Sequence, residues 1–384
     1  MSSNRPPVLA GVMSGTSADG IDVAIVRMDK RPELLHFSAF PMPEPLRTDI
    51  LHLAEPQHGN DIDLLGKTDR ALGEAIAQTV LDAVRQANMQ PGEITAIGSH
   101  GQTVRHRPAM QPAFSLQIGC PSTIAERAGM TTVADFRRRD MAAGGEGAPL
   151  TPFVHRMLFA RRDAATTVVN IGGIANVTWL GRTGEVSGFD TGPGNMVMDG
   201  LMRAFSRGEA PFDADGALAA SGTVCEPLLR HLLDHPFLSR TPPKSCGREE
   251  FGDGLVAEIL AWPNLRDADR MRTALELTVQ SITNSRRWMP GEPPRHWHIC
   301  GGGTRNRFLM ERLAAVLAPA DVASTDAADM PSDALEAVSF AILAWQTLQG
   351  LSNTLPQVTG ASHPVCGGHI VPGENWPRIL REMI

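Results

Sequence analysis

A carboxylate that could act as a general base lies at the start of a glycine-rich turn. Asp190 follows the short segment 186–189 and precedes the turn TGPGN. We expect segment 186–189 to be a strand, and the end of a strand at a cleft is a usual position for a catalytic carboxylate. An Asp that caps its own turn is the structural alternative. Asp190 is therefore a candidate for taking a proton from water.

Four glycine-rich turns could bind phosphate through their backbone amides. They have the sequences SGTSADG, IGG, GFDTGPGN and GGGTRN. Turns of this kind let N–H groups converge on an anion without side chains in the way. Glycine is common in ordinary turns, so the four together carry more weight than any single turn. No GxxxxGK[ST] string and no GxGxxG string after a strand occurs, which argues against P-loop and Rossmann folds.

The apolar segments around these turns predict two β-hairpins of one design. Residues 8–12 and 21–26 flank the first turn, and residues 167–170 and 175–180 flank Gly172 and Gly173. Periodicity and capping residues predict further elements: a long amphipathic helix over 61–87, a strand over 94–98, a helix over 151–159, a strand over 296–300 followed by a helix over 306–317, and a last helix that begins near Ser332.

The two hairpins lie about 160 residues apart, which indicates a duplicated α/β unit. A chain of 384 residues also exceeds the usual size of a single hydrophobic core. We expect an N-terminal lobe of residues 1–134 plus about 345–384, and a C-terminal lobe of residues 135–344. Segment 135–150 is expected to be an interdomain loop, and segment 206–248 is rich in loop-forming residues.

Composition argues against several partners. The net charge of −7 and the isoelectric point near 5.9 provide no basic surface for nucleic acid or an anionic membrane. The five cysteines have no metal-ligand or redox spacing, and they are expected to be reduced thiols. No secretion leader and no apolar stretch of roughly 18 residues is present. We therefore expect a cytoplasmic protein.

Eight ordered motifs resemble those of the anhydro-N-acetylmuramic acid kinase family. Between residues 11 and 361 the chain contains, in the order of that family, GVMSGTSADGID, SHGQTVRH, DFRRRD, GGEGAPL, NIGGIANVT, GFDTGPGNMVMD, ICGGGTRN and VTGA. So many matches in one order are not expected by chance. The resemblance implies the two-domain actin-like ATPase or sugar-kinase fold, in which two ribonuclease H-like domains flank a central cleft.

The resemblance also implies a reaction. The family phosphorylates the 6-oxygen of 1,6-anhydro-N-acetylmuramic acid with ATP while water opens the anhydro bridge, giving N-acetylmuramic acid 6-phosphate and ADP in cell-wall recycling. By this resemblance Asp190 is the base that takes the proton from water, as in an inverting glycosidase. The γ-phosphoryl group can cap the leaving 6-oxygen, so that a separate general acid is not needed.

Four further residues are candidates for contacting the sugar. The resemblance implies a contact for Glu336, although a Glu near a helix start also compensates the helix dipole. The run of arginines in DFRRRD, with Asp135 and Arg138, could bind the lactyl carboxylate, or it could be a solvated charge run. His100 could position a sugar hydroxyl or water, or it could be a structural histidine.

The hairpin turns and the GGG segment are expected to surround ATP. Asp19 and Asp22 are candidates for holding Mg²⁺ through water, of which Asp19 is taken as the metal candidate; Asp is also common in turns without a metal. The expected ATP-binding residues are Gly15, Thr16, Ser17, Ala18, Asp19, Gly20, Ile21, Asp22, Asn170, Gly172, Gly173, Asn176, Gly301, Gly302, Gly303 and Asn306.

The sequence departs from the family pattern at one position that could matter. The family usually reads GGQGAPL, and this chain has Glu146 in place of the Gln. If this side chain touched the anionic substrate, its charge would weaken binding.

Two other functions share the phosphate-binding motifs. One is a kinase of the same fold that acts on a different sugar or carboxylate, and the other is an actin-like ATPase that forms filaments. A substrate panel separates the first from the family reaction, and loss of turnover in Asp190→Asn argues against the second. The family resemblance also implies a homodimer.

Overall fold

The chain forms two compact units. The computed structural model describes residues 6–15, 17–54 and 61–383. Unit 1 comprises Met1–Leu158 and Ala334–Ile384, and unit 2 comprises Phe159–Asp333. The boundaries between the two lobes predicted from the sequence follow residue 134 and residue 344. In the structure the boundaries fall elsewhere, because residues 135–158 and the start of the last long helix belong to the first unit.

Unit 1 contains a six-stranded sheet with the order β13-β7-β4-β1-β2-β3. Neighbours β1, β2 and β3 are antiparallel, whereas β4 runs parallel to both β1 and β7. The first predicted hairpin, β1–β2, and the predicted strand β4 are thus confirmed. The strands are β1 (Val8–Met13), β2 (Gly20–Arg27), β3 (Glu33–Pro41), β4 (Ile94–Ser99), β7 (Thr132–Ala134) and β13 (His369–Val371).

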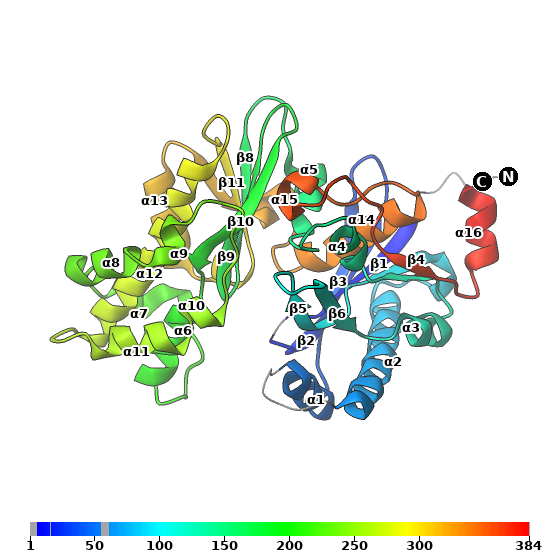
Figure 1. Cartoon of the computed structure of the whole chain (residues 1–384), viewed down its shortest axis with the longest axis horizontal. Coiled ribbons are helices and arrows are strands. Elements are labelled where there is room, and N and C mark those ends of the chain that lie inside the picture. Colours follow the sequence, from blue (N-terminus) through cyan, green and yellow to red (C-terminus); the bar gives the residue numbers. More distant parts are fainter. Residues whose placement is uncertain (1–5, 16, 55–60, 384) are drawn as a thin grey trace. The chain divides into compact units, whose positions relative to one another are not determined.

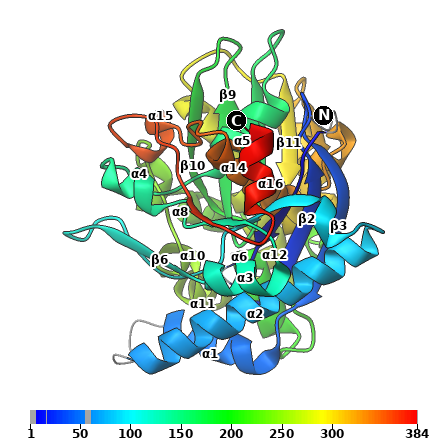
Figure 2. The same ribbon diagram turned by 90° about the vertical axis from the view of Figure 1, so that its right-hand side faces the viewer.

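Two long helices cover the two faces of this sheet. Helix α14 (Leu335–Leu348) packs on β1, β2 and β4, and α2 (Ile62–Gln86) packs on the other face through its apolar stripe (Figures 1 and 2). The backbone of α14 approaches the strands so closely that only glycine fits beneath it. A Cβ atom on Gly11 would lie 1.9 Å from the carbonyl oxygen of Ala337, and one on Gly98 would lie 2.1 Å from that of Phe340. This close packing fixes the start of α14 above the sheet.

The predicted capping role of Ser332 is wrong, because α14 begins three residues later at Leu335. The Ser332 hydroxyl instead lies 3.3 Å from the hydroxyl of Thr304.

Segment 135–150 is not an interdomain loop, since it belongs to unit 1 and contains a short helix. The buried Asp140 carboxylate accepts hydrogen bonds from the amide of Gly147 and the hydroxyl of Thr359. The amide of Glu146 donates to the carbonyl of Thr359, and the Glu146 side chain is exposed. The motifs DFRRRD, GGEGAPL and VTGA are therefore joined into one folded corner of unit 1.

The remaining elements of unit 1 are α1 (Glu44–Ala54), the 3₁₀ turn Pro91–Glu93, the hairpin strands β5 (Gln102–Arg107) and β6 (Phe114–Ile118), and the helices α3 (Pro121–Ala128), α4 (Arg138–Ala142), α5 (Thr151–Phe159), α15 (Pro356–Thr359) and α16 (Trp376–Met383). Helices α1 and α2 lie side by side in Figure 2.

Unit 2 contains a five-stranded sheet with the order β10-β9-β8-β11-β12. Strands β8, β9 and β10 are antiparallel neighbours, and β11 runs parallel to both β8 and β12. The second predicted hairpin, β8–β9, and the predicted strand β11 are confirmed. The strands are β8 (Thr166–Ile171), β9 (Ile174–Leu180), β10 (Val186–Pro193), β11 (His296–Cys300) and β12 (Asp321–Ser324).

The helices of unit 2 enclose a core with the sheet, in which α12 packs against α6, α7, α8, α13 and β10. Segment 206–248, expected to be mostly loop, contains three short helices, α7, α8 and α9. The helices are α6 (Met196–Phe205), α7 (Ala217–Ala220), α8 (Glu226–Leu233), α9 (Pro236–Ser239), α10 (Arg248–Phe251), α11 (Asp253–Ala261), α12 (Asp267–Asn284) and α13 (Arg307–Leu317), and 3₁₀ turns are Ala214–Gly216, Ser285–Trp288, Gly302–Arg305 and Thr325–Ala328.

The two sheets share one topology. If strands are counted within each of these two sheets, and the added edge strand β13 is left out, both follow the order 3-2-1-4-5 with the same pattern of parallel and antiparallel neighbours. This is the ribonuclease H-like arrangement. The duplication and the fold class expected from the sequence are confirmed.

Across the described ranges, none of the helices combines the length and the apolar character needed to cross a lipid bilayer.

Candidate active site

Asp190 lies inside β10, the edge strand of the unit 2 sheet, rather than after the end of a strand. The expected strand end at residue 189 is therefore wrong. The strand continues to Pro193 through an irregularity in register between Asp190 and Gly192. Gly192 has a φ of +145°, which a residue with a Cβ rarely adopts. Irregularities of this kind re-aim a side chain, and here the affected side chain is the candidate base.

Segment 244–246 binds the exposed edge of β10 at Asp190. The amide of Asp190 donates to the carbonyl of Lys244 at 3.1 Å, and the amide of Cys246 donates to Oδ2 of Asp190 at 3.0 Å. Burial raises the pKa of Asp190 from 3.8 to about 6, although the Cys246 hydrogen bond and the charge of Lys244 act in the opposite direction. A carboxylate with this pKa is ionised at neutral pH and is still basic enough to accept a proton.

Two predicted turns of unit 2 pack directly against each other. The amide of Gly194 donates to the carbonyl of Gly173 at 2.9 Å, and the amide of Asn195 donates to that of Gly172 at 2.8 Å. A Cβ on Gly194 would lie 2.3 Å from the carbonyl oxygen of Gly172. The amides of Gly194 and Asn195 are thus engaged within the unit, and the two turns form one double loop.

The GGG segment packs against the end of β8. Gly301 has a φ of +80°, and a Cβ there would lie 2.3 Å from Oδ1 of Asn170. A Cβ on Gly303 would lie 2.4 Å from a side-chain carbon of Ile171. Asn176 lies opposite Asn170 in the β8–β9 ladder. The fold therefore gathers the expected ATP-binding residues of unit 2 at one end of β8.

A cavity of about 200 Å³ opens beside this cluster. Gly302 and Asn306 line it together with Phe212, Asp199 and Arg305. Asn306 also caps α13, because its side-chain oxygen accepts from the amide of Leu309 at 2.9 Å. Burial raises the pKa of Asp199 to about 6. An apolar ring beside hydrogen-bond acceptors is a surface that suits a nucleoside.

The first hairpin turn of unit 1 is tightly folded. The amide of Ala18 donates to the carbonyl of Gly15 at 3.0 Å, and Ala18 has a left-handed φ of +51°. Ser17 is exposed, whereas the side chain of Ala18 is buried. The predicted residue Thr16 lies outside the described residues. Gly15, Ser17 and Ala18 therefore present backbone and small side chains, which suits phosphate binding.

The predicted residues after this turn have different surroundings. The carboxylate of Asp19 is 70% exposed and lies 3.2 Å from the guanidinium of Arg47. Gly20, Ile21 and Asp22 belong to β2, and the Ile21 side chain lies in the hydrophobic core. Only the backbone of Ile21 could therefore reach a nucleotide.

Glu336 lies in the first turn of α14. The Glu336 side chain is exposed, yet the protein around its carboxylate removes part of the hydration of that group and so raises its pKa. The negative charge of Asp22 raises the pKa further. The positive charge of Arg137 acts in the opposite direction. Glu336, Asp22 and Arg137 thus form one electrostatic group on unit 1.

Arg137 and His100 hold each other in fixed orientations. Arg137 donates to Nε2 of His100 at 2.9 Å and to the carbonyl of Gly147 at 2.9 Å. Since Nε2 accepts, Nδ1 carries the hydrogen and donates to the carbonyl of Gly101 at 3.0 Å. Burial lowers the pKa of His100 to about 3, so the ring is neutral, and it packs at a tilt of 38° against Phe340 with ring centroids 4.8 Å apart. Both ring nitrogens therefore have partners within unit 1.

A second cavity, of about 450 Å³, lies in unit 1. Three of the four predicted sugar contacts, His100, Asp135 and Arg138, line it. Asp135 has a φ of +58°, and its Oδ2 lies 3.4 Å from Nε of Arg138 and 3.4 Å from Nδ1 of His369. Its Oδ1 is buried and has no hydrogen-bond partner among the described residues, and the same holds for Oε1 of Gln117 in the wall of this cavity.

The predicted residues therefore fall into two groups. Unit 2 carries Asp190 and the Asn and Gly residues of β8 and the GGG segment, and unit 1 carries the first turn with Glu336, His100, Asp135 and Arg138. Arg138, chosen from the run of three arginines, lines the unit 1 cavity, whereas its neighbour Arg137 binds His100 and the carbonyl of Gly147. Gln117, in the wall of the unit 1 cavity, and Lys244, beside Asp190, were not singled out, because no motif distinguishes a buried amide oxygen or a lysine beside a distant strand.

Two ribonuclease H-like units with glycine-bearing hairpins, and a half-buried carboxylate on the edge strand of one, are the arrangement of the actin-like ATPase and sugar-kinase fold class. A family model described as anhydro-N-acetylmuramic acid kinase matches residues 7–373. The chain belongs to the anhydro-N-acetylmuramic acid kinase family.

Two relatives with that name show the extent of the similarity. The protein of Xanthomonas campestris pv. campestris strain 8004 is 45% identical over 371 residues, which are 95% of this chain and 97% of the relative. That of Idiomarina loihiensis is 41% identical over 360 residues, 93% and 97% of the two chains. Among solved structures, a ROK family glucokinase from Streptomyces griseus in complex with glucose and AMPPNP is 13% identical, with a TM-score of 0.40 over 88% of this chain and 99% of that one.

Proposed function

We propose that the chain converts 1,6-anhydro-N-acetylmuramic acid, ATP and water to N-acetylmuramic acid 6-phosphate and ADP, with Asp190 as the base. The chain is an ATP-dependent phosphotransferase with an alcohol acceptor, as its family membership implies. The observation that carries the role of Asp190 is its place on an edge strand, half-buried, with a pKa near 6. Peptidoglycan recycling is the process that supplies this substrate.

The bonds balance with one protein base. Water forms a bond to the anomeric carbon and gives its proton to Asp190, while the bond from that carbon to the 6-oxygen breaks. The 6-oxygen forms a bond to the γ-phosphorus, and the bond to the leaving oxygen of ADP breaks. The phosphoryl group takes the place that a proton from a general acid would otherwise fill.

We place the sugar on unit 1. The buried acceptor oxygens Asp135 Oδ1 and Gln117 Oε1 suit the hydroxyl and amide hydrogens of an acetamido sugar, since a buried acceptor without a partner is costly. Arg138 lines the unit 1 cavity and Arg137 lies behind its wall against His100, and a guanidinium suits the lactyl carboxylate. His100 keeps both ring nitrogens engaged, so its role is to orient Arg137 rather than to bind sugar directly. Glu336 supplies a further acceptor.

We assign ATP to the glycine-rich turns. Gly15, Ser17 and Asp19 of the first turn, with Gly173 and Gly301, can supply backbone amides for the phosphates; the Asn170 side chain lies beside Gly301, and the cavity at Gly302 and Phe212 suits the nucleoside. Asp19 fits Mg²⁺, since its exposed carboxylate can act through water on an ion held mainly by phosphate oxygens. The ion would offset the charge of the phosphate oxygens.

We further propose that the chain acts in the cytoplasm, where ATP is available, and that it is a homodimer. Light scattering coupled to size-exclusion chromatography measures the mass, and a mass equal to the 41.3 kDa of one chain would contradict the dimer.

The reaction is tested by nuclear magnetic resonance of the purified protein with ATP and the anhydro sugar. Phosphorus spectra should show a sugar 6-phosphate and ADP, and proton spectra should show loss of the anhydro anomeric signal at the same rate. A panel of other sugars tests the substrate. Phosphorylation of another sugar at a higher kcat/KM, or a product that keeps the anhydro bridge, would overturn the proposal.

A further inference from the structure

The Asp190 carboxylate is held by a segment that lies more than fifty residues away in the sequence. The backbone carbonyl of Lys244 accepts a hydrogen bond from the amide of Asp190, and the backbone amide of Cys246 donates to the Asp190 carboxylate. Because β10 is an edge strand, it has no other strand on this side to fix its backbone. Segment 244–246 takes the place of that strand at the catalytic position.

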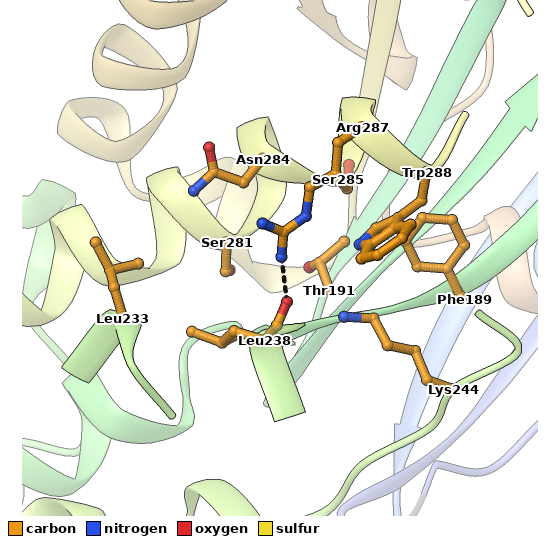
Figure 3. A pocket seen from close by; sticks show the side chains of 10 residues that line it. All are labelled: Phe189, Thr191, Leu233, Leu238, Lys244, Ser281, Asn284, Ser285, Arg287 and Trp288. Carbon is orange, nitrogen blue, oxygen red and sulfur yellow. Dashed lines mark hydrogen bonds between the residues drawn. The ribbon is translucent and has the colours of Figure 1, made fainter. Parts of the chain in front are cut away.

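The side chain of Lys244 is itself tightly placed. Its ammonium donates to the carbonyl of Phe237 at 3.3 Å and lies 4.6 Å from the centre of the Phe237 ring. The Phe189 ring, from the residue before Asp190, lies 6.0 Å away. Figure 3 shows the Lys244 amine directed toward the segment of Leu238, the residue whose carbonyl accepts from Arg287. The lysine is thus held beside β10 by aromatic rings and a carbonyl group.

A small polar cavity borders this lysine. It has a volume of about 60 Å³, and Figure 3 shows Lys244 and Arg287 in its wall with the hydroxyl groups of Thr191 and Ser281. This volume is enough for one or a few water molecules. Lys244 can therefore keep part of its hydration, which a charged group needs in such a position.

Lysine is rare in this sequence, and position 244 is one of the few places where it occurs. The chain has 35 basic residues, and its lysines are Lys30, Lys67 and Lys244. All its other cations are arginines. A lysine is a compact point charge that changes its protonation more readily than arginine, and it fits between two rings where a planar guanidinium would need more room.

We propose that Lys244 is a positioning residue, which keeps the Asp190 carboxylate ionised and correctly aimed through its positive charge and through the backbone hydrogen bonds of its segment. This inference rests on the proposed function of Asp190 as the base. Lys244 does not touch the reacting atoms in this scheme, and it acts through Asp190.

The surrounding charges set the pH range in which Asp190 and Lys244 are both ionised. Asp190 is faced by Lys244 and by Cys246 and Glu250, and Lys244 is faced by Arg287 and Arg240. Burial, followed by repulsion from Arg287, lowers the pKa of Lys244 to about 8. Asp190 is ionised above about pH 6 and Lys244 is charged below about pH 8, so both charges are present between these values.

The test is the pH dependence of kcat/KM in Lys244→Met, Lys244→Gln and Lys244→Arg. In Lys244→Met and Lys244→Gln the acid limb, which is the rise of kcat/KM with pH as Asp190 ionises, should move to higher pH by about one unit, because the positive charge is gone. Activity then falls about fivefold at pH 6 and is almost unchanged at pH 8.5, where the wild-type lysine is itself mostly neutral. Lys244→Arg should restore the acid limb even if kcat stays low. Lys67→Met makes the same change at an exposed site on the other unit and should leave the profile unchanged.

A second measurement does not depend on activity. Carbon-13 spectra of protein labelled at the aspartate carboxyl carbons follow the ionisation of Asp190, whose signal is identified by its loss in Asp190→Asn. The signal should titrate at higher pH in Lys244→Gln, which keeps a donor for the Phe237 carbonyl, and at the wild-type pH in Lys67→Met.

The outcomes separate the two proposals. An unchanged acid limb in Lys244→Gln, or a Lys244→Arg profile equal to that of Lys244→Met, would overturn the role of Lys244. If the wild type phosphorylates no anhydro sugar, the proposed function fails. The carbon-13 titration then still decides whether Lys244 controls the ionisation of Asp190, and equal titration in wild type and Lys244→Gln would refute it. If Lys244→Met does not fold, Lys244→Gln provides the same comparison.

Discussion

The backbone amide of Cys246 donates a hydrogen bond to Oδ2 of Asp190, with an N···O distance of 3.0 Å. The donor belongs to the main chain, so every side chain except proline at position 246 preserves it. The bond joins the candidate base on β10 to the connection between α9 and α10. The geometry of the base is therefore set by a backbone group that no catalytic motif contains.

Asp190→Asn should abolish turnover and leave nucleotide binding intact. The amide has the shape of the carboxylate but cannot accept a proton from water, and loss of a general base typically lowers the rate by about 10²–10⁴-fold. Sugar-dependent ADP release measures the rate, and calorimetry measures the affinity for ADP. A variant with near wild-type turnover would show that another group takes the proton.

The same substitution should stabilise the protein at neutral pH. The pKa of Asp190 is raised from 3.8 to about 6 on folding, so the folded state binds the proton more tightly than the unfolded state does. Its contribution to stability is therefore full at low pH and is lost as the pH rises toward 6. The melting temperature of Asp190→Asn should exceed that of the wild type at pH 8, and the difference should shrink at pH 4. A lower melting temperature at pH 8 would contradict a desolvated carboxylate.

Arg137→Met should destabilise unit 1 far more than Arg139→Met. The first change leaves Nε2 of His100 and the carbonyl of Gly147 without their donor and removes the positive charge near Glu336. Loss of the donor from such a set of buried hydrogen bonds costs roughly 2–4 kcal/mol of unfolding free energy. Arg139 is exposed, and its removal should cost less than about 0.5 kcal/mol.

Denaturant unfolding of both arginine variants measures these costs, and the KM for the sugar tests the proposed binding role. Arg137→Lys keeps the charge but cannot bridge His100 and Gly147 in the same geometry. Equal stability of the Arg137 and Arg139 variants would show that the buried network contributes little.

Gly98→Ala should disrupt the packing of α14 on the sheet. The new Cβ would lie 2.1 Å from the carbonyl oxygen of Phe340, so that the helix must move. Overpacking of this kind costs about 1–3 kcal/mol or more, and the displacement of Glu336 should also reduce activity. Thermal unfolding and the KM for the sugar report the two effects.

Gly254→Ala is the matched control for this change. Gly254 lies in α11, and a Cβ there meets no atom within 4 Å. Alanine should be neutral or should stabilise the helix by up to about 1 kcal/mol. A wild-type melting temperature in Gly98→Ala would mean that α14 can shift without cost.

Regular elements with a clear pattern could be predicted from the sequence. Apolar and β-branched runs located β1 and β8, and the stop at Pro91 and Gly92 bounded α2, because these signals depend on neighbours a few residues away. Asp190 was recognised through its turn, and family membership through eight ordered motifs. The extent of β10 was missed, because the partners that prolong it, on β9 and in segment 244–246, are distant in the chain.

The sequence alone thus determined the fold class, the family and the identity of the candidate base. Only the tertiary structure decided which of three consecutive arginines binds His100, which glycines lie beneath α14, and that Lys244 and Cys246 hold Asp190. These features depend on contacts between residues that are far apart in the chain, and the local sequence pattern is the same whichever way such a side chain turns. Burial, and the pKa shifts that follow from it, exist only once those distant segments have packed together.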